Sequence, residues 1–348
     1  MFVMLNLLYR QDDFPIFQNR MYDSKEDAIN CPKGNIRLVE NLETGLVYND
    51  AFLPELMVYD GSYQNEQAIS PLFKRHLEGI ATTIDRLMGK EHLVEIGCGK
   101  GYFLEMLIAK GFDVTGFDPT YEGANPRVKR KYFEPGDIAE GSDLILRHTL
   151  EHIQHPVGFL EQLKAANGGS GKIYIEVPCL DWICEHKAWF DVFYEHVNYF
   201  RLIDFNQIFG EVLESGKVFG GQYLYIIAEL SSLRTPVIDM NNRVDFPSNF
   251  TNDISEQNRV AIWGGASKGV IFALLSARAG NPVTTIIDIN QAKQGKFTAG
   301  TGLQIKSPAH GLLDIKVGST IYVMNSNYLE EIKEMSNHSF NYIGIARE

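Results

Sequence analysis

At 348 residues the chain is too long for one hydrophobic core, so we expect two or three domains. The net charge of -12 argues against nucleic acid or an anionic membrane surface as the main partner. No apolar run approaches the roughly 20 residues that cross a bilayer, and the N-terminus does not resemble a signal peptide, so we expect a cytoplasmic protein. The four cysteines form no CxxC pair, so we expect reduced thiols and no metal site.

Residues 1–74 are expected to form an irregular N-terminal cap. Short strand-like runs at 36–40 and 45–49 lie among turn signals. The polar and aromatic stretch at 59–65 is typical of a loop that covers a pocket.

A domain of alternating helices and strands is predicted from 75 to 231, preceded by helical spacing from about 71. Short connections between the elements indicate a mostly parallel sheet that is covered on both faces. The predicted strands are 92–97, 114–118, 143–148 and 172–178, the predicted helices are 71–88, 102–111 and 157–166, and two β runs occupy 211–230.

Residues 232–257 are rich in Pro, Ser, Asn and Asp and are predicted to be a linker. A second, smaller α/β unit follows at 258–348. Its predicted strands are 259–264, 283–290, 319–325 and 341–346, and its predicted helices are 268–280 and 328–335.

A glycine-rich turn follows the first strand of the larger domain. Gly97, Gly99 and Gly101 let the backbone turn tightly and approach a ligand at the start of the next helix. A dinucleotide fingerprint would need glycine at position 102, which is Tyr102. The pattern acidic-x-G-x-G-x-G, beginning at Glu95, instead resembles motif I of class I methyltransferases, whose sheets usually end in an antiparallel pair. The alternative is a structural turn in an unrelated Rossmann-like domain.

This resemblance implies S-adenosylmethionine as the cofactor. It places Glu95 near the amino-acid part of the cofactor and Asp118, at the end of the second strand, at the ribose diol. It places Asp137 beside the adenine amino group, and Arg147 at the end of a later strand is also assigned to cofactor binding.

Two histidine-rich segments, 147–156 and 190–200, follow strands of the same domain. Ligands of open α/β sheets lie beyond the carboxyl ends of the strands, so both segments should converge on the cofactor. A histidine beside a carboxylate suits removal of a proton alpha to a carbonyl, which methyl transfer to carbon requires. For any single histidine, a surface or core role is the usual alternative.

The second segment resembles the signature Y-H-E-H-x-S-Y-F of the nucleotide-sugar 3-C-methyltransferases, which methylate C3 of deoxy-4-keto hexoses. The resemblance implies that His196 is the base and that Glu195 is its partner carboxylate. The segment R-H-x-L-E-H-I carries a family active-site histidine onto His152. Phe193 replaces the family's leading tyrosine, so Tyr194 becomes the candidate that stabilises the enolate with His152.

The smaller unit opens with a strand-turn-helix pattern, G-A-S-K-G, that begins at Gly265. It lacks the glycine order of an NAD site, and Val270 stands where a P-loop requires lysine. It resembles the C-terminal domain of the same methyltransferases, as do the motif at 288–295 and Asn325. The turn and Lys268 are therefore expected to hold a substrate diphosphate. A structural duplicate without a ligand is the alternative.

The resulting hypothesis is a C-methyltransferase that acts on a nucleotide-linked keto-deoxysugar and contains two Rossmann-like α/β domains. O- or N-methylation of a sugar or another small metabolite is one alternative, and a non-catalytic cofactor-fold binding protein is another. The family usually carries a four-cysteine zinc module at the N-terminus. Because Cys31 is the single cysteine of this cap, we expect the cap to lack that metal.

Overall fold

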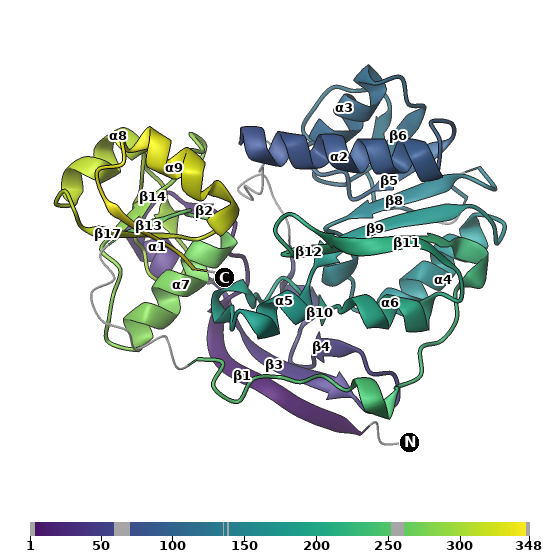
Figure 1. Ribbon diagram of the computed structural model, residues 1–348, viewed down its shortest axis with the longest axis horizontal. Helices are drawn as coiled ribbons and strands as arrows, with labels where there is room; N and C mark the ends of the chain where they lie inside the picture. The colour runs from purple at the N-terminus through teal and green to yellow at the C-terminus, as the bar shows by residue number, and fades with distance from the viewer. Residues whose placement is uncertain (1–3, 59–69, 135, 138, 252–260, 346–348) are drawn as a thin grey trace.

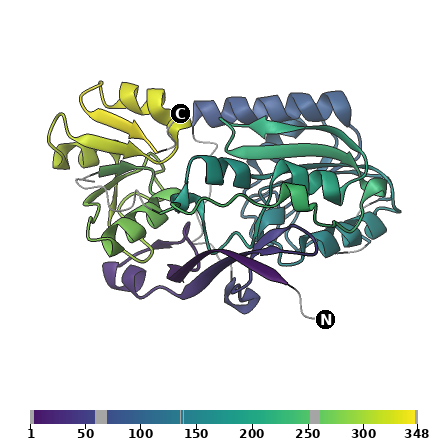
Figure 2. The ribbon, with the colours of Figure 1, turned by 60° about the horizontal axis from the view of Figure 1, so that its bottom comes forward.

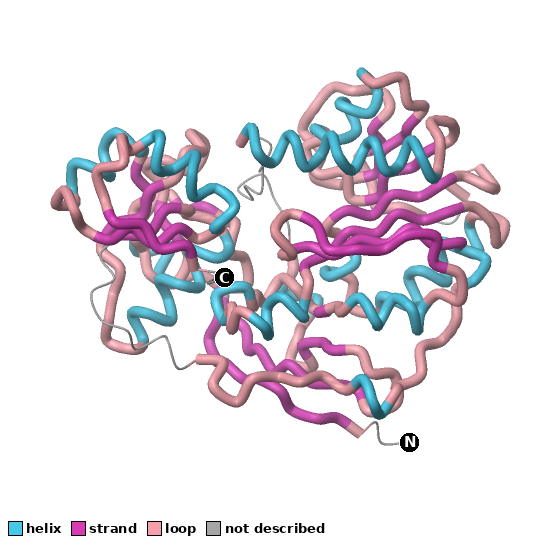
Figure 3. The backbone as a smooth tube through the Cα atoms, in the orientation of Figure 1, coloured by secondary structure: helices cyan, strands magenta, loops and turns pink. Residues whose placement is uncertain are grey.

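The computed structural model describes residues 4–58, 70–134, 136–137, 139–251 and 261–345. The loop expected at 59–65 and the end of the expected linker lie outside this part. Within it, the strands gather into two α/β units and a separate sheet near the N-terminus (Figures 1 and 3).

The larger unit is built on a sheet whose described strands have the order β11-β12-β9-β8-β5-β6-β7. Five strands run parallel, namely β5 (Leu93–Ile96), β6 (Val114–Phe117), β7 (Val128–Lys129), β8 (Asp143–Arg147) and β9 (Lys172–Pro178). An antiparallel pair, β12 (Tyr223–Glu229) and β11 (Val212–Val218), completes one edge. The predicted class I methyltransferase fold is therefore confirmed.

Helices cover both faces of this sheet. In Figure 1, α2 (Pro71–Leu87) and α3 (Tyr102–Ala109) lie above it, and α4 (Pro156–Ala166), α5 (Leu180–Glu185) and α6 (Leu202–Ile208) lie below it. The side chain of Ser70 caps the start of α2 by accepting from backbone N–H groups of its first turn. Phe73, Leu77 and Ile84 recur at helical spacing and are buried, so one face of α2 packs on the sheet.

The N-terminal cap is more regular than the sequence predicted. It forms an antiparallel sheet in the order β1-β3-β4-β10, from β1 (Leu5–Pro15), β3 (Lys33–Asn41), β4 (Val47–Asn49) and β10 (Asn198–Tyr199). The expectation of an irregular cap was wrong because β1 carries polar residues and register shifts that hide its strand pattern. The fourth strand belongs to the second histidine-rich segment, so the cap holds that segment in place.

The smaller unit has a parallel sheet in the order β16-β14-β13-β17-β18. Its strands are β13 (Ala261–Trp263), β14 (Thr285–Ile287), β16 (Ile305–Lys306), β17 (Thr320–Val323) and β18 (Asn341–Gly344), and its helices are α7 (Ser267–Arg278), α8 (Pro308–Gly311) and α9 (Leu329–Met335). The cap joins this unit through α1 (Lys25–Ile29) and through β2 (Met21–Tyr22), which pairs with β15 (Phe297–Thr298).

The three parts share one apolar core. Trp189 of the larger unit stacks on Phe272 of α7 with ring centroids 5.2 Å apart, and Phe14 and Ile36 of the cap belong to the same buried cluster. Figure 2 shows the cap strands running beneath both α/β units. Among the described helices, none combines the length and hydropathy that crossing a membrane requires.

Candidate functional site

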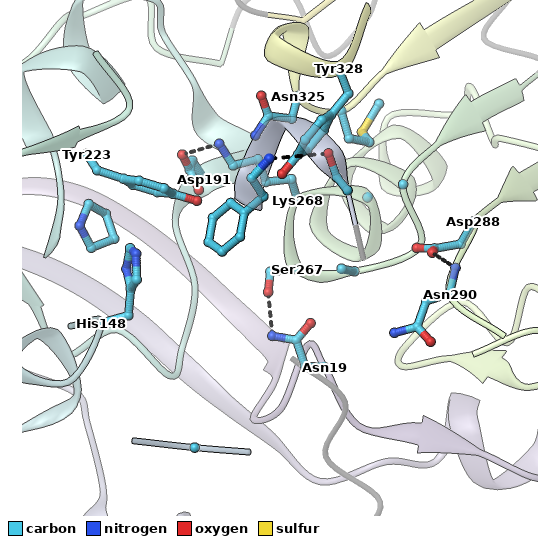
Figure 4. A pocket seen from close by; sticks show the side chains of 18 of the residues that line it. Asn19, His148, Asp191, Tyr223, Ser267, Lys268, Asp288, Asn290, Asn325 and Tyr328 are labelled. Atoms are coloured by element: carbon cyan, nitrogen blue, oxygen red, sulfur yellow. Dashed lines mark hydrogen bonds and ion pairs between the residues drawn. The ribbon is translucent and has the colours of Figure 1, made fainter. Parts of the chain in front are cut away.

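A cavity of about 370 Å³ lies where the cap and the two α/β units meet. The larger unit lines it with the glycine-rich turn and both histidine-rich segments, and the smaller unit lines it with the start of α7 and the loops after β14 and β17. Figure 4 shows His148 and Tyr223 on one side of this cavity and Lys268, Asn325 and Tyr328 from the smaller unit on another.

The glycine-rich turn presents open backbone to the cavity. Gly97, Gly99 and Gly101 all have positive φ, the conformation that favours glycine. A Cβ atom on Gly97 would lie 2.3 Å from Thr149 Oγ1, whereas a Cβ atom on Gly99 would meet nothing within 4 Å among the described residues. Gly99 therefore faces free space into which a ligand can come close to the backbone.

Glu95 lies behind this turn and is 2 % exposed. Its Oε2 atom has no hydrogen-bond partner among the described residues, although it lines the cavity. Burial raises the pKa of Glu95 to about 7, Arg147 opposes that rise and Asp118 adds to it. A buried carboxylate that lacks a donor fits the ammonium group of the cofactor's amino-acid part, so the residues present fit S-adenosylmethionine.

Asp118 ties the turn to the end of the second strand. Its Oδ2 accepts the Gly99 N–H at 2.8 Å, and its Oδ1 accepts the N–H and the hydroxyl of Thr120 at 2.8 and 2.7 Å. The carboxylate is thus held at the expected strand end, and Oδ2, which accepts one hydrogen bond from the described residues, keeps a second lone pair for a ribose hydroxyl.

Asp137 lies in the loop between β7 and β8 and contacts other residues of that loop. Its carboxylate is paired with Lys131 Nζ at 2.6 Å and accepts the Glu134 N–H at 2.8 Å. Positions 135 and 138 lie outside the described residues, so the contact of Asp137 with adenine stays a prediction.

Arg147 belongs to a buried charge cluster around Glu176, the acid in the middle of β9. Glu176 Oε1 lies 3.1 Å from Arg147 Nη2, 3.1 Å from His148 Nε2 and 3.2 Å from His76 Nε2. Burial would raise the pKa of Glu176, but Arg147, His148 and His76 hold it well below its usual range. Sequence reasoning placed Arg147 at the cofactor but missed Glu176 and His76. Each lies in an element with an apolar pattern, Glu176 in β9 and His76 in α2, and the polar side chain within that pattern was the signal that could have identified it.

His148 is half-buried in the cavity wall, and its pKa favours the protonated form. Burial lowers its pKa, but Glu151 and Glu176 raise it to about 9. Its ring lies edge-on to Tyr223, with centroids 4.5 Å apart. His148 and Glu151 lie in the first histidine-rich segment, 147–156, and the sequence predicted no role for either of them.

The structure brings His196 and His152 together in the cavity, with ring centroids 5.0 Å apart. Burial lowers the pKa of His196 well below its usual value, and the electrostatic influence of the neighbouring His152, His148 and Lys268 side chains lowers it further. His152 Nδ1 lies 2.9 Å from the backbone oxygen of Glu195. His196 is therefore a neutral imidazole near neutral pH, with one ring lone pair.

The two residues that precede His196 contact the cap. Glu195 Oε1 accepts the Gln18 N–H at 2.7 Å, which ties the segment to the cap. The hydroxyl of Tyr194 accepts the Leu53 N–H at 2.9 Å, and its ring packs on the backbone of Gly34. Tyr194 is thus buried against the cap and does not line the cavity, and the expectation that it stabilises an enolate was wrong because the chain bends at Tyr194 and Glu195 and does not keep the alternation of a strand, in which Tyr194 and His196 would share a face.

The smaller unit contributes an anchored lysine. Lys268 Nζ is paired with Asp191 at 2.8 Å and donates to Gln222 Oε1 at 2.8 Å, and Gln222 Nε2 donates to Asn325 Oδ1 at 2.9 Å. Lys268 and Asn325 line the cavity, whereas Gly265 packs on apolar side chains and donates its N–H to Asp288 Oδ2 at 2.8 Å. The three predicted substrate residues thus lie at one turn and its neighbouring strand end.

Comparison with known proteins gives one family and several solved structures. A family model described as "Methyltransferase domain" matches residues 63–212. The comparison with curated proteins finds no match. A SAM-dependent methyltransferase from Aquifex aeolicus is 18% identical, over 44% of this chain and 89% of its own, with a TM-score of 0.34. The magnesium protoporphyrin IX methyltransferase from Synechocystis PCC 6803, solved with bound SAH, is 15% identical, over 49% and 89%, with a TM-score of 0.35.

The family match covers the strands and turns that build the glycine-rich end of the cavity. The strand order, with its antiparallel edge, is the one expected of class I methyltransferases. Residues 63–212 therefore contain a class I methyltransferase domain, and the chain is an S-adenosylmethionine-dependent methyltransferase.

Proposed function

We propose that this methyltransferase transfers a methyl group to a carbon atom of a nucleotide-linked keto-deoxysugar, with His196 as the base. The observation that carries the proposal is a half-buried, neutral His196 in a cavity shared by the cofactor turn and the smaller α/β unit. S-adenosylmethionine supplies an electrophilic methyl group, so the protein has to provide a nucleophilic carbon beside it.

The cofactor would be held by the larger unit. Glu95 would accept from its ammonium group, Gly97 and Gly99 would let the backbone approach it, and Asp118 would bind the ribose hydroxyls. The unpaired Oε2 of Glu95 and the open face of Gly99 support this assignment.

The substrate would lie between His196 and the smaller unit. A carbon next to a carbonyl becomes nucleophilic when a base takes its proton and the electrons pass to the carbonyl oxygen. His196 would accept that proton, with His152 beside it. The positive charge of His148 favours the developing enolate, and it also explains why His196 stays neutral until a substrate arrives.

Lys268 and Asn325 would meet the nucleotide diphosphate. The cavity wall carries the cations Lys100, Arg147, Lys268 and Lys293 alongside five acidic side chains, so an anionic substrate would depend on a local cation, Lys268, rather than on an overall positive charge. Because Asp191 already neutralises Lys268, a phosphate would have to replace that carboxylate as the lysine's partner.

A hydroxyl or amine acceptor would need the same neutral imidazole, so O- or N-methylation is the competing function. Isotope exchange separates the two. The full-length enzyme is incubated in D₂O with a nucleotide-linked 4-keto-6-deoxyhexose and S-adenosylhomocysteine. We expect deuterium to enter the carbon alpha to the ketone in the wild type and not in His196→Asn. Methylation of an oxygen or nitrogen of this substrate, without exchange at that carbon, would refute C-methylation.

A further inference from the structure

Three side chains of the cavity have the spacing of a metal-ligand set. Glu151, His152 and His196 each place one potential ligand atom within 4.8 Å of the others. Glu151 and His152 lie in a 3-10 helix, Leu150–His152, and His196 precedes β10 on the facing segment. All three line the cavity, so a bound ion would have access to small molecules there.

Two of the three present buried atoms that form no hydrogen bond with the described residues. Glu151 is 1 % exposed, and neither of its carboxylate oxygens accepts a hydrogen bond from the described residues. Nδ1 of His196 is buried and likewise lacks a hydrogen-bond partner among those residues. Leaving such atoms without partners costs free energy, and a cation would provide the partner that they lack.

His152 already has the arrangement of a metal-binding histidine. Its Nδ1 lies 2.9 Å from the backbone oxygen of Glu195. An N–H donated to a carbonyl at this position leaves the lone pair on Nε2, and a contact of this kind commonly orients histidine ligands of metal ions.

Glu151 also forms an ion pair with His148. His148 Nδ1 lies 3.4 Å from Glu151 Oε1, while the other ring nitrogen of His148 lies 3.1 Å from Glu176. A cation can therefore take the Glu151 carboxylate while His148 keeps Glu176 as its partner.

We propose that Glu151, His152 and His196 bind a divalent transition-metal cation of the Zn²⁺ or Co²⁺ type. Two imidazoles and one carboxylate favour such ions over Mg²⁺ or Ca²⁺, which prefer all-oxygen sites. This site is independent of the cysteines, whose number led us to expect no metal. It also goes beyond the proposed methyl transfer and does not depend on it.

Occupancy of this site has a chemical consequence for His196. A neutral imidazole has a single ring lone pair, and the nitrogen without it carries hydrogen. If a cation takes that lone pair, His196 cannot also accept a proton. The bound cation would therefore inhibit a reaction in which His196 is the base.

The test uses Co²⁺ and the chelator-treated full-length protein without cofactor or sugar. We expect one equivalent of Co²⁺ to bind, with a visible ligand-field spectrum and a saturable calorimetric signal. Glu151→Gln and His152→Ala should each weaken binding at least about tenfold, because losing even a group that only orients a metal ligand costs about that much. His155→Ala is the matched control, since His155 is exposed and lies three residues away from the site.

A wild-type protein that does not bind Co²⁺ would overturn the proposal. So would equal affinities in Glu151→Gln, His152→Ala and His155→Ala, with folding checked by thermal melting. If one of the two site variants fails to fold, the Co²⁺ affinity of the other is compared with that of His155→Ala. Because the titration contains no cofactor or sugar, its failure leaves the methyl-transfer proposal to the isotope test.

Once a turnover assay exists, Co²⁺ should inhibit the wild type and a chelator should restore its activity, while stimulation by Co²⁺ would contradict the inhibitory role.

Discussion

Replacing Glu95 by Gln should make the cofactor-free protein more stable at alkaline pH. The pKa of Glu95 is raised from 4.5 to about 7, so in the folded state the carboxylate holds its proton more tightly than in the unfolded state. The stabilisation from the protonated form is fully present below pH 4.5 and is lost as the pH rises through about 7. A shift of this size corresponds to about 3 kcal/mol in the free energy of unfolding.

Glu95→Gln keeps the size and shape of the side chain and removes the charge. Against the wild type, the variant's free energy of unfolding in urea should be higher by up to about 3 kcal/mol at pH 8, and the difference should shrink toward pH 5. Glu91→Gln is the control, because Glu91 precedes the same strand and is exposed. Its substitution should leave stability within about 0.5 kcal/mol of the wild type.

Cofactor binding should change in the opposite direction. If the carboxylate pairs with the cofactor's ammonium group, Glu95→Gln should weaken S-adenosylmethionine binding at pH 8 by about 1.5–3 kcal/mol, measured by calorimetry. A variant that is less stable than the wild type at pH 8 would show that Arg147 and the surrounding protein already compensate the charge. An unchanged affinity would refute the assignment of Glu95 to the cofactor.

Three further substitutions test the site. Asp118→Ala should weaken S-adenosylmethionine binding by about 1.5–3 kcal/mol, and unchanged affinity in calorimetry would exclude a ribose contact. His196→Asn should keep cofactor affinity and melting temperature but lower the single-turnover rate by about 10²–10⁴-fold, whereas early unfolding with near-normal turnover at low temperature would indicate a structural histidine. Tyr194→Phe should cost about 1 kcal/mol of stability, through loss of the bond to the Leu53 N–H, with little change in rate. A rate loss larger than that of Tyr223→Phe, which alters a hydroxyl at the cavity, would contradict this placement.

Local sequence patterns were sufficient to predict the core of the larger domain. Glu95 lies in a short, otherwise apolar strand that the three glycines follow, and this order predicts a turn at the carboxyl edge of a sheet. The alternation of helices and strands likewise predicted the parallel sheet, because a strand that follows a crossover helix returns to the same sheet parallel to the strands before it.

Long-range contacts decided what the sequence could not show. The strand Leu5–Pro15 is defined by its pairing with Lys33–Asn41, and its own residues give little alternation. Glu176 becomes a partner for His76 after a strand and a helix separated by about a hundred residues come together. Tyr194 faces the cap because the segment around it pairs with a strand of the cap.

The two α/β units use the same local arrangement on either side of the cavity. In the larger unit, Asp118 accepts the N–H of Gly99 at 2.8 Å, and in the smaller unit Asp288 accepts the N–H of Gly265 at the same distance. In each case an acid at the end of the second strand holds the turn that opens a helix. One turn lies within the domain that uses S-adenosylmethionine, and the other turn borders the same cavity. A methyl donor and its acceptor must meet within one enclosed space, and two facing turns of this kind give each of them a separate binding surface. This arrangement is the structural reason to place the acceptor, rather than a second cofactor, beside Lys268.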